Sequence, residues 1–83
     1  MSDIEATIRE VLGTTATLST PATALDVRDD LFDRGLTSLA TVELMLALEG
    51  RLGVEFPDEA LTRQTFRTIA SLQDTLSRLG AAA

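Results

Sequence analysis

The sequence predicts an all-α fold, a small up-down helical bundle with three main helices, one short helix and a long loop between helices one and two. Apolar residues recur at helical spacing in three separate segments. Turn-forming residues lie between these segments and are widely spaced along the chain. The chain has 83 residues, of which 45% are hydrophobic, and three Phe are its only aromatic residues. A largely aliphatic core of this kind favours helices over sheet. A chain of this length forms one domain, which we expect to span residues 1–83.

The first helix is expected over about residues 3–13. Ser2 and Glu5 have the spacing of a capping box, which satisfies two backbone amides at a helix start. The apolar residues that follow at helical spacing are Ile4, Ile8, Val11 and Leu12. Gly13 then offers a stop, so we predict an amphipathic helix that packs one face on the core.

Residues 14–36 are expected to form the long loop, which is rich first in threonine and then in aspartate. Long connections in compact domains are usually packed by their own side chains. The candidate anchors are Leu18, Leu25, Val27, Leu31 and Phe32. The aspartates nowhere follow the Asp-x-Asp-x-Asp-Gly order of an EF-hand loop, and we therefore predict no dedicated metal site.

The second main helix is expected to begin after a turn at Gly35, with Thr37 as its N-cap and Ser38 in its first turn. At about 100° per residue, one apolar stripe is wide enough to face the core. This stripe contains Thr41, Leu44, Met45, Leu48 and Leu52. A second, separate strip lies on the side of Ser38 and contains Leu39, Val42 and Leu46. Because a small domain needs only one buried face, the second strip predicts a docking surface beside Ser38.

Glycines mark the end of this helix. Gly53 is expected to terminate it, and Val54 and Phe56 should then alternate inward. Gly50 lies inside the helical pattern and costs about 1 kcal/mol relative to Ala. It indicates either fraying or a site where little side-chain bulk fits.

The short helix is predicted at residues 57–61, where acidic residues stand at a helix N-terminus. Leu61 and Phe66 are its expected core contacts. Thr68 should cap the last main helix. The apolar stripe of that helix consists of Ile69, Leu72, Leu76 and Leu79. Gly80 should end it, and residues 1–2 and 80–83 are expected to be frayed.

The formal net charge is −6, with 13 acidic residues against seven arginines. Nucleic-acid-binding proteins need a basic patch that neutralises phosphates, so we predict no nucleic-acid partner. A basic protein surface is the natural complement of this charge. The sequence has neither an apolar run long enough to cross a bilayer nor the pattern of a signal peptide. We therefore expect a monomer in the cytoplasm without a membrane partner.

The sequence contains no His, Cys or Tyr, and all of its basic residues are Arg. These absences remove the usual general bases, thiol nucleophiles and Schiff-base formers. An enzyme that uses paired carboxylates is disfavoured, because no two acidic residues are flanked by a pocket in the expected fold. We predict no catalytic residue and a protein on which other enzymes act.

The stretch around Ser38 resembles the acyl and peptidyl carrier protein family. The residues that carry the resemblance are Leu36-Thr37-Ser38-Leu39, Thr41-Val42-Glu43-Leu44, Ala47-Leu48-Glu49 and Val54-Glu55-Phe56-Pro57-Asp58. The resemblance implies that Ser38 carries a 4′-phosphopantetheine arm, which a separate phosphopantetheinyl transferase supplies from coenzyme A. The arm would hold an acyl or aminoacyl group as a thioester, and the chain would deliver that group to partner enzymes at high effective concentration.

The resemblance also implies the other partners and the surface that they contact. These partners would be an acyl- or aminoacyl-loading ligase and a downstream transferase or synthase. Leu39, Val42 and Leu46 would supply the apolar contact. Glu43 and Glu49 would supply the charge that steers basic partners.

Departures from the pattern of fatty-acid carriers favour a specialised, stand-alone aminoacyl carrier. Fatty-acid carriers usually have Asp immediately before the serine, where this chain has Thr37. Three further positions that are commonly acidic in those carriers are Ala40, Gly50 and Arg51. The C-terminal pattern from Phe56 to Ile69 resembles discrete carriers that receive amino acids from synthetase-like ligases.

The alternative is a small helical interaction domain without a prosthetic group. In that case Ser38 would only cap the helix, and the strip beside it would bind a partner helix. The two hypotheses differ in whether Ser38 accepts an arm from coenzyme A.

Overall fold

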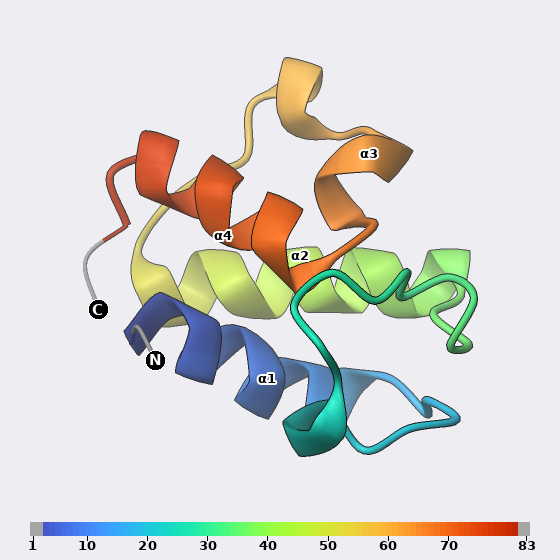
Figure 1. The fold of residues 1–83 in the computed structure, drawn as a ribbon. Coiled ribbons are helices and arrows are strands. Elements are labelled where there is room, and N and C mark those ends of the chain that lie inside the picture. The colour runs from blue at the N-terminus through green and yellow to red at the C-terminus, as the bar shows by residue number, and fades with distance from the viewer. Residues whose placement is uncertain (1–2, 82–83) are drawn as a thin grey trace.

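The computed structural model describes residues 3–81, and within them it contains helices and no strand (Figure 1). The α-helices are α1 (Asp3–Thr15), α2 (Ser38–Leu52), α3 (Arg63–Phe66) and α4 (Ile69–Arg78). Two short 3₁₀ helices are η1 (Ala22–Ala24) and η2 (Asp58–Ala60). In Figure 1, α1 and α2 run in opposite directions, and α1 packs against both α2 and α4. The predicted all-α bundle with three main helices is confirmed.

The core lies between the three main helices. Eight large side chains in it are fully buried, namely Ile8, Leu12, Leu31, Leu44, Leu48, Ile69, Leu72 and Leu76. Most of them recur three or four residues apart, which is the spacing of one helix face. The predicted core stripe of the second helix is confirmed at Leu44 and Leu48, and its other three members are half-buried. Ala40, which we did not assign to the core, is buried as well.

Two helices continue through glycines that we expected to interrupt them. Helix α1 passes Gly13 and ends at Thr15. The hydroxyls of Thr14 and Thr15 donate to the Val11 carbonyl at 3.0 and 2.8 Å, and these bonds stabilise the last turn beyond the glycine. Helix α2 passes Gly50, where an added Cβ would meet no atom within 4 Å. The helix therefore does not end there and the space is open, so neither reason that we gave for Gly50 applies.

The other helix ends follow the sequence more closely. Gly53 ends α2 with φ +64°, and its N–H donates to the Glu49 carbonyl at 3.0 Å. Thr68 caps α4 as expected, by accepting from the Ser71 N–H at 2.9 Å. The Ser71 hydroxyl in turn accepts from the Thr68 N–H, which completes a capping box that we did not predict. Ser2, which belongs to the predicted first capping box, lies outside the described residues.

The chain after α4 is hydrogen-bonded as far as the structure describes it. Gly80 has φ +83°, and its N–H donates to the Ser77 carbonyl at 3.1 Å. The Ala81 N–H donates to the Leu76 carbonyl at 3.0 Å. Residues 80 and 81 thus make defined contacts where we expected fraying, and residues 82–83 lie outside the described range. No helix within residues 3–81 is long and apolar enough to cross a membrane.

The segment between α2 and α4 differs from the prediction. Where we expected one short helix at residues 57–61, the structure has the 3₁₀ turn η2 and then the separate helix α3. Thr62 starts α3, because its hydroxyl accepts from the Thr65 N–H at 3.2 Å. Phe66 is buried as predicted, but the prediction for Leu61 is wrong, since 46% of it is exposed. Leu61 lies in the bend between the two short helices, which turns its side chain away from the core.

The long loop between α1 and α2 is packed by its own side chains, as predicted. Leu25 and Leu31 are buried, and the other three anchors are partly buried against the core. Backbone hydrogen bonds tie the loop to the C-terminal part of the chain. The Leu31 N–H donates to the Arg67 carbonyl at 2.7 Å, and the Ala70 N–H donates to the Val27 carbonyl at 2.9 Å. The segment that leads into Ser38 is therefore fixed against α3 and α4.

Candidate functional site

Ser38 is the first residue of α2, and its neighbours perform the capping. Gly35 turns the chain with φ +109°, and a Cβ at this glycine would lie 3.3 Å from the Thr17 carbonyl oxygen. Thr37 is extended, and its hydroxyl accepts from the Ala40 N–H at 3.1 Å. Within residues 3–81 the Ser38 hydroxyl has no hydrogen-bond partner, and the residue is exposed. Because Thr37 caps the helix, the Ser38 hydroxyl is not needed for capping.

The predicted apolar strip beside Ser38 is exposed. The exposed fractions are 71% for Leu39, 49% for Val42 and 56% for Leu46. Glu43 lies on the same helix and is exposed too. These three apolar side chains are therefore not used for internal packing, which leaves them available for contact with a partner.

Glu49 differs from the other residues that we predicted to contact partners. It is half-buried, and its Oε2 accepts from the Phe56 N–H at 2.8 Å. This bond holds the segment after α2 against the helix. The centroid of the buried Phe56 ring lies 5.5 Å from that of the Phe66 ring. Glu49 thus has a structural role that the sequence did not indicate.

A groove with a volume of about 340 Å³ opens at Ser38. It is lined by Phe32, Ser38, Thr41, Val42, Met45, Leu61, Thr62, Arg63 and Phe66. One wall therefore comes from α2 and the other from the segment around α3. We did not predict the α3 wall, although the spacing of Thr62 and Thr65 gave a local signal for a helix start.

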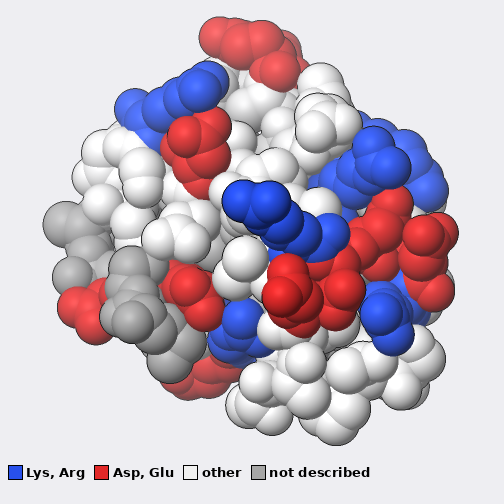
Figure 2. All heavy atoms as spheres, viewed as in Figure 1, with Lys and Arg blue, Asp and Glu red and all other residues white. Residues whose placement is uncertain are grey.

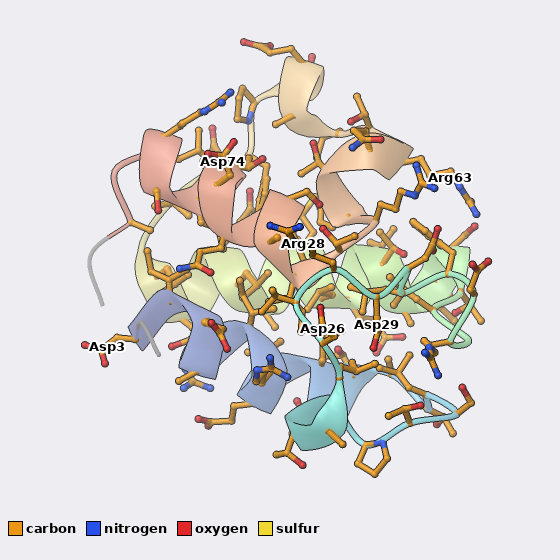
Figure 3. All side chains as sticks on the ribbon, viewed as in Figure 1. Asp3, Asp26, Arg28, Asp29, Arg63 and Asp74 are labelled. Carbon is orange, nitrogen blue, oxygen red and sulfur yellow. The ribbon has the colours of Figure 1, made fainter. Side chains whose placement is uncertain are left out.

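Arg63 is the charged residue of the groove. Its guanidinium carbon lies 3.9 Å from the centroid of the Phe32 ring, which is a cation–π contact. Figure 3 shows the Arg63 side chain extending from α3 on the side of the N-terminal end of α2. The groove lining contains no carboxylate.

Charged pairs fix the loop in front of the site. The Asp30 carboxylate accepts from Arg67 Nε at 2.9 Å and from the Phe32 N–H at 2.9 Å. The hydrogen bond from Arg67, aided by those from the Asp33 and Phe32 backbone, holds the pKa of the Asp30 carboxyl below its usual value. Arg34 pairs with Asp29 at 3.5 Å. Figure 2 accordingly shows acidic and basic side chains adjoining one another on this face, with no broad patch of one sign.

The surroundings of Ser38 fit an anionic group on its oxygen. The first backbone amides of a helix and the helix dipole favour negative charge at this end. The groove that starts at Ser38 adds one cation and no carboxylate. Within residues 3–81 no group of three or more His, Cys, Asp or Glu side chains could hold a metal ion. The site therefore offers an accessible hydroxyl, an anion-compatible helix start and an apolar groove.

Known proteins are similar to this chain over most of its length. Residues 2–76 match the family described as "Phosphopantetheine attachment site". The chain is 41% identical over 73 residues to an aminoacyl carrier protein of Agrobacterium fabrum (strain C58), and the match covers 88% of each chain.

Two solved structures are similar in fold as well. One is a crystal structure of an engineered Bradyrhizobium japonicum glycine:carrier protein ligase complexed with a carrier protein from Agrobacterium tumefaciens and ATP. The similar chain in it is 40% identical with a TM-score of 0.86, over 90% of this chain and 97% of that one. The other is the solution structure of a holo acyl carrier protein from Nitrosomonas europaea, 29% identical with a TM-score of 0.80, over 94% of this chain and 95% of that one.

Proposed function

The chain belongs to the phosphopantetheine attachment-site family and is a carrier protein, and on that premise we propose that Ser38 is the residue that carries its 4′-phosphopantetheine arm. The observation that supports this assignment is the exposed Ser38 hydroxyl without a hydrogen-bond partner among the described residues. Since Thr37 supplies the N-cap, modification of Ser38 leaves the start of α2 intact.

In the attachment step, the Ser38 oxygen forms a bond to the phosphorus of coenzyme A that bears the pantetheine half. The Ser38 proton passes to a base of the separate transferase, and the nucleotide half leaves as adenosine 3′,5′-bisphosphate. The N-terminus of α2 then stabilises the anionic phosphodiester on Ser38. When bound, the arm supplies a terminal thiol that holds the cargo as a thioester.

The exposed strip of Leu39, Val42 and Leu46 is the surface to which partner enzymes dock. Its side chains are 49–71% exposed, and Glu43 beside them adds a negative charge that steers basic partners. The partners are a phosphopantetheinyl transferase, a loading ligase and a downstream transferase or synthase. The chain itself is not an enzyme, because it has no His, Cys or Lys with which to carry out the chemistry.

The cargo is an amino acid, and the loading enzyme is an amino acid ligase. Two similarities support this assignment: the 41% identical aminoacyl carrier protein, and the 40% identical chain from a complex with a glycine:carrier protein ligase. Thr37 in place of the aspartate of fatty-acid carriers points in the same direction. The protein acts as a monomer in the cytoplasm, where coenzyme A and adenylate-forming ligases are found.

Intact-mass analysis tests the attachment residue. The purified chain is incubated with coenzyme A, magnesium and a broad-specificity phosphopantetheinyl transferase. The wild type and the control variant Ser77→Ala, which removes another exposed serine, should each gain the mass of one arm, whereas Ser38→Ala should gain none. An arm on Ser38→Ala, or an unmodified wild type, would contradict the proposal.

A further inference from the structure

We propose that Arg63 acts as a charge filter in the groove beside Ser38. It lets an uncharged group at the end of the arm settle in the groove, and it keeps the ammonium of an aminoacyl group in solvent. The inference rests on the proposed function, since it needs an arm on Ser38. It adds a role for a residue of α3 that neither caps a helix nor belongs to the exposed strip.

The groove opens directly at the attachment point. It begins at Ser38, and most of its lining is apolar, from Phe32, Val42, Met45, Leu61 and Phe66. An arm on Ser38 is a flexible chain, so its free end can fold back onto the groove that starts at its own attachment point. An uncharged end group removes apolar surface from water in this position, which stabilises the folded-back arm.

Arg63 is the one charged residue in the groove lining, and no carboxylate of the described residues 3–81 pairs with it. Five of the seven arginines pair with a carboxylate within 4.0 Å, namely Arg9, Arg34, Arg51, Arg67 and Arg78. Arg63 has no such partner among residues 3–81 and instead lies over the Phe32 ring at 3.9 Å. A protein with a net charge of −6 thus has a positive charge at the groove beside its reactive serine.

Two effects then exclude an aminoacyl end group. An ammonium loses hydration in an apolar groove, which is unfavourable. The ammonium is also repelled by the like charge of Arg63, because both charges would lie in one small groove of about 340 Å³. At partly screened distances of this size, we expect the repulsion to lower occupancy of the groove by about threefold to tenfold. An amino acid cargo therefore stays outside the groove, where a receiving enzyme can reach it.

Two end groups of matched size test the filter. Whole arms that end in glycyl or propionyl are transferred to the chain from the corresponding coenzyme A thioesters. These groups differ only in an ammonium against a methyl group. Methyl NMR signals of Val42, Met45 and Leu61 then report groove occupancy, with the unloaded arm as the reference. In the wild type, the propionyl form should shift these signals, and the glycyl form should shift them at least about threefold to tenfold less, because lost hydration adds to the repulsion by Arg63.

Three variants assign the difference to Arg63. The ratio of the signal shifts of the propionyl and glycyl forms is called the gap. In Arg63→Gln the gap should shrink about threefold to tenfold. In Arg63→Lys it should persist, because the charge is kept. Arg28→Gln is the matched control, since Arg28 is exposed, has no carboxylate partner among the described residues and is not in the groove lining. At about 1 M salt, where screening acts over about 3 Å, the wild-type gap should also shrink.

The outcomes separate this inference from the proposed function. Intact mass is measured first, and a chain that accepts no arm overturns both. If the arm is present but the gap is equal in wild type and Arg63→Gln, the charge filter is wrong and Ser38 remains the attachment residue. An equal loss of the gap in Arg28→Gln would also overturn it, because net charge and not the position of Arg63 would then be the cause.

Discussion

The two faces of α2 carry similar side chains and have opposite roles. Leu44 and Leu48 are fully buried in the core, where α2 packs against α1, whereas Leu39 and Leu46 are 71% and 56% exposed. Composition alone does not distinguish these leucines, since all four lie in one helix of 15 residues. What separates them is their angle around the helix axis relative to the rest of the bundle. The comparison shows that the second apolar face is not needed for the core, which supports our proposal that partners dock on it.

The strongest test of this comparison uses two leucines that lie two positions apart. Leu48→Ala should lower the free energy of unfolding by about 2–5 kcal/mol, because it opens a cavity in the core. Leu46→Ala should change it by at most about 0.5 kcal/mol, because that side chain is exposed. Urea denaturation followed by circular dichroism measures both. Equal losses in the two variants would mean that the exposed face also supports the fold.

The same two variants should affect loading by the ligase in the opposite order. The Leu46→Ala holo protein should be loaded by its ligase with a kcat/KM lower by about fivefold or more, because partner contacts concentrate in a few exposed apolar residues. Leu48→Ala, assayed where it is still folded, should be loaded nearly as well as the wild type.

The second test compares two neighbouring hydroxyls at the start of α2. Thr37→Ala should lower the free energy of unfolding by about 1 kcal/mol, because the Ala40 N–H loses its acceptor. Ser38→Ala should leave stability within about 0.5 kcal/mol, because no described residue bonds to its hydroxyl. Thermal unfolding of the unmodified proteins measures both. A larger loss of stability in Ser38→Ala than in Thr37→Ala would mean that Ser38, and not Thr37, caps the helix.

The smallest expected effect concerns the ion pair between Asp30 and Arg67, which fixes the loop between α1 and α2. The folded-state pKa of Asp30 is lowered below 3.8, chiefly by the hydrogen bond from Arg67. Its contribution to stability is therefore present above about pH 3.8 and is lost as the pH falls through the lowered value. Asp30→Asn should be slightly less stable than the wild type at pH 7, and the difference should narrow as the pH falls below 3.8. A constant difference across this pH range would mean that the ionised carboxylate is not what stabilises the loop.

The sequence predicted most of the features that depend on local pattern. The two stripes of α2 follow a period of 3.6 residues, and the cap at Thr37 depends on residues only three positions apart. Glycine was a poorer guide, because Gly13 and Gly50 lie within helices that tertiary packing stabilises. Helix α3 was missed as a separate element because four residues are too few for a periodic pattern.

Features that join distant parts of the chain could not be predicted. The contact of Arg63 with Phe32 and the bond from Arg67 to Asp30 connect positions 31 and 37 residues apart. The role of Glu49 depends on where the chain returns after Gly53, which brings the Phe56 N–H to its carboxylate. The groove likewise joins residues of the loop, of α2 and of the segment around α3, so its α3 wall could be recognised only from the folded chain.

Thr37 caps α2 and Ser38 does not, which has a consequence for folding and modification of the chain. Because Thr37 caps α2 without the serine oxygen, the polypeptide needs no modification at Ser38 to complete the start of this helix. On the assignment of Ser38 that we propose, attachment of the arm is then an event separate from folding. Position 38 is also a suitable place to attach a synthetic probe, because the helix cap does not use the Ser38 hydroxyl.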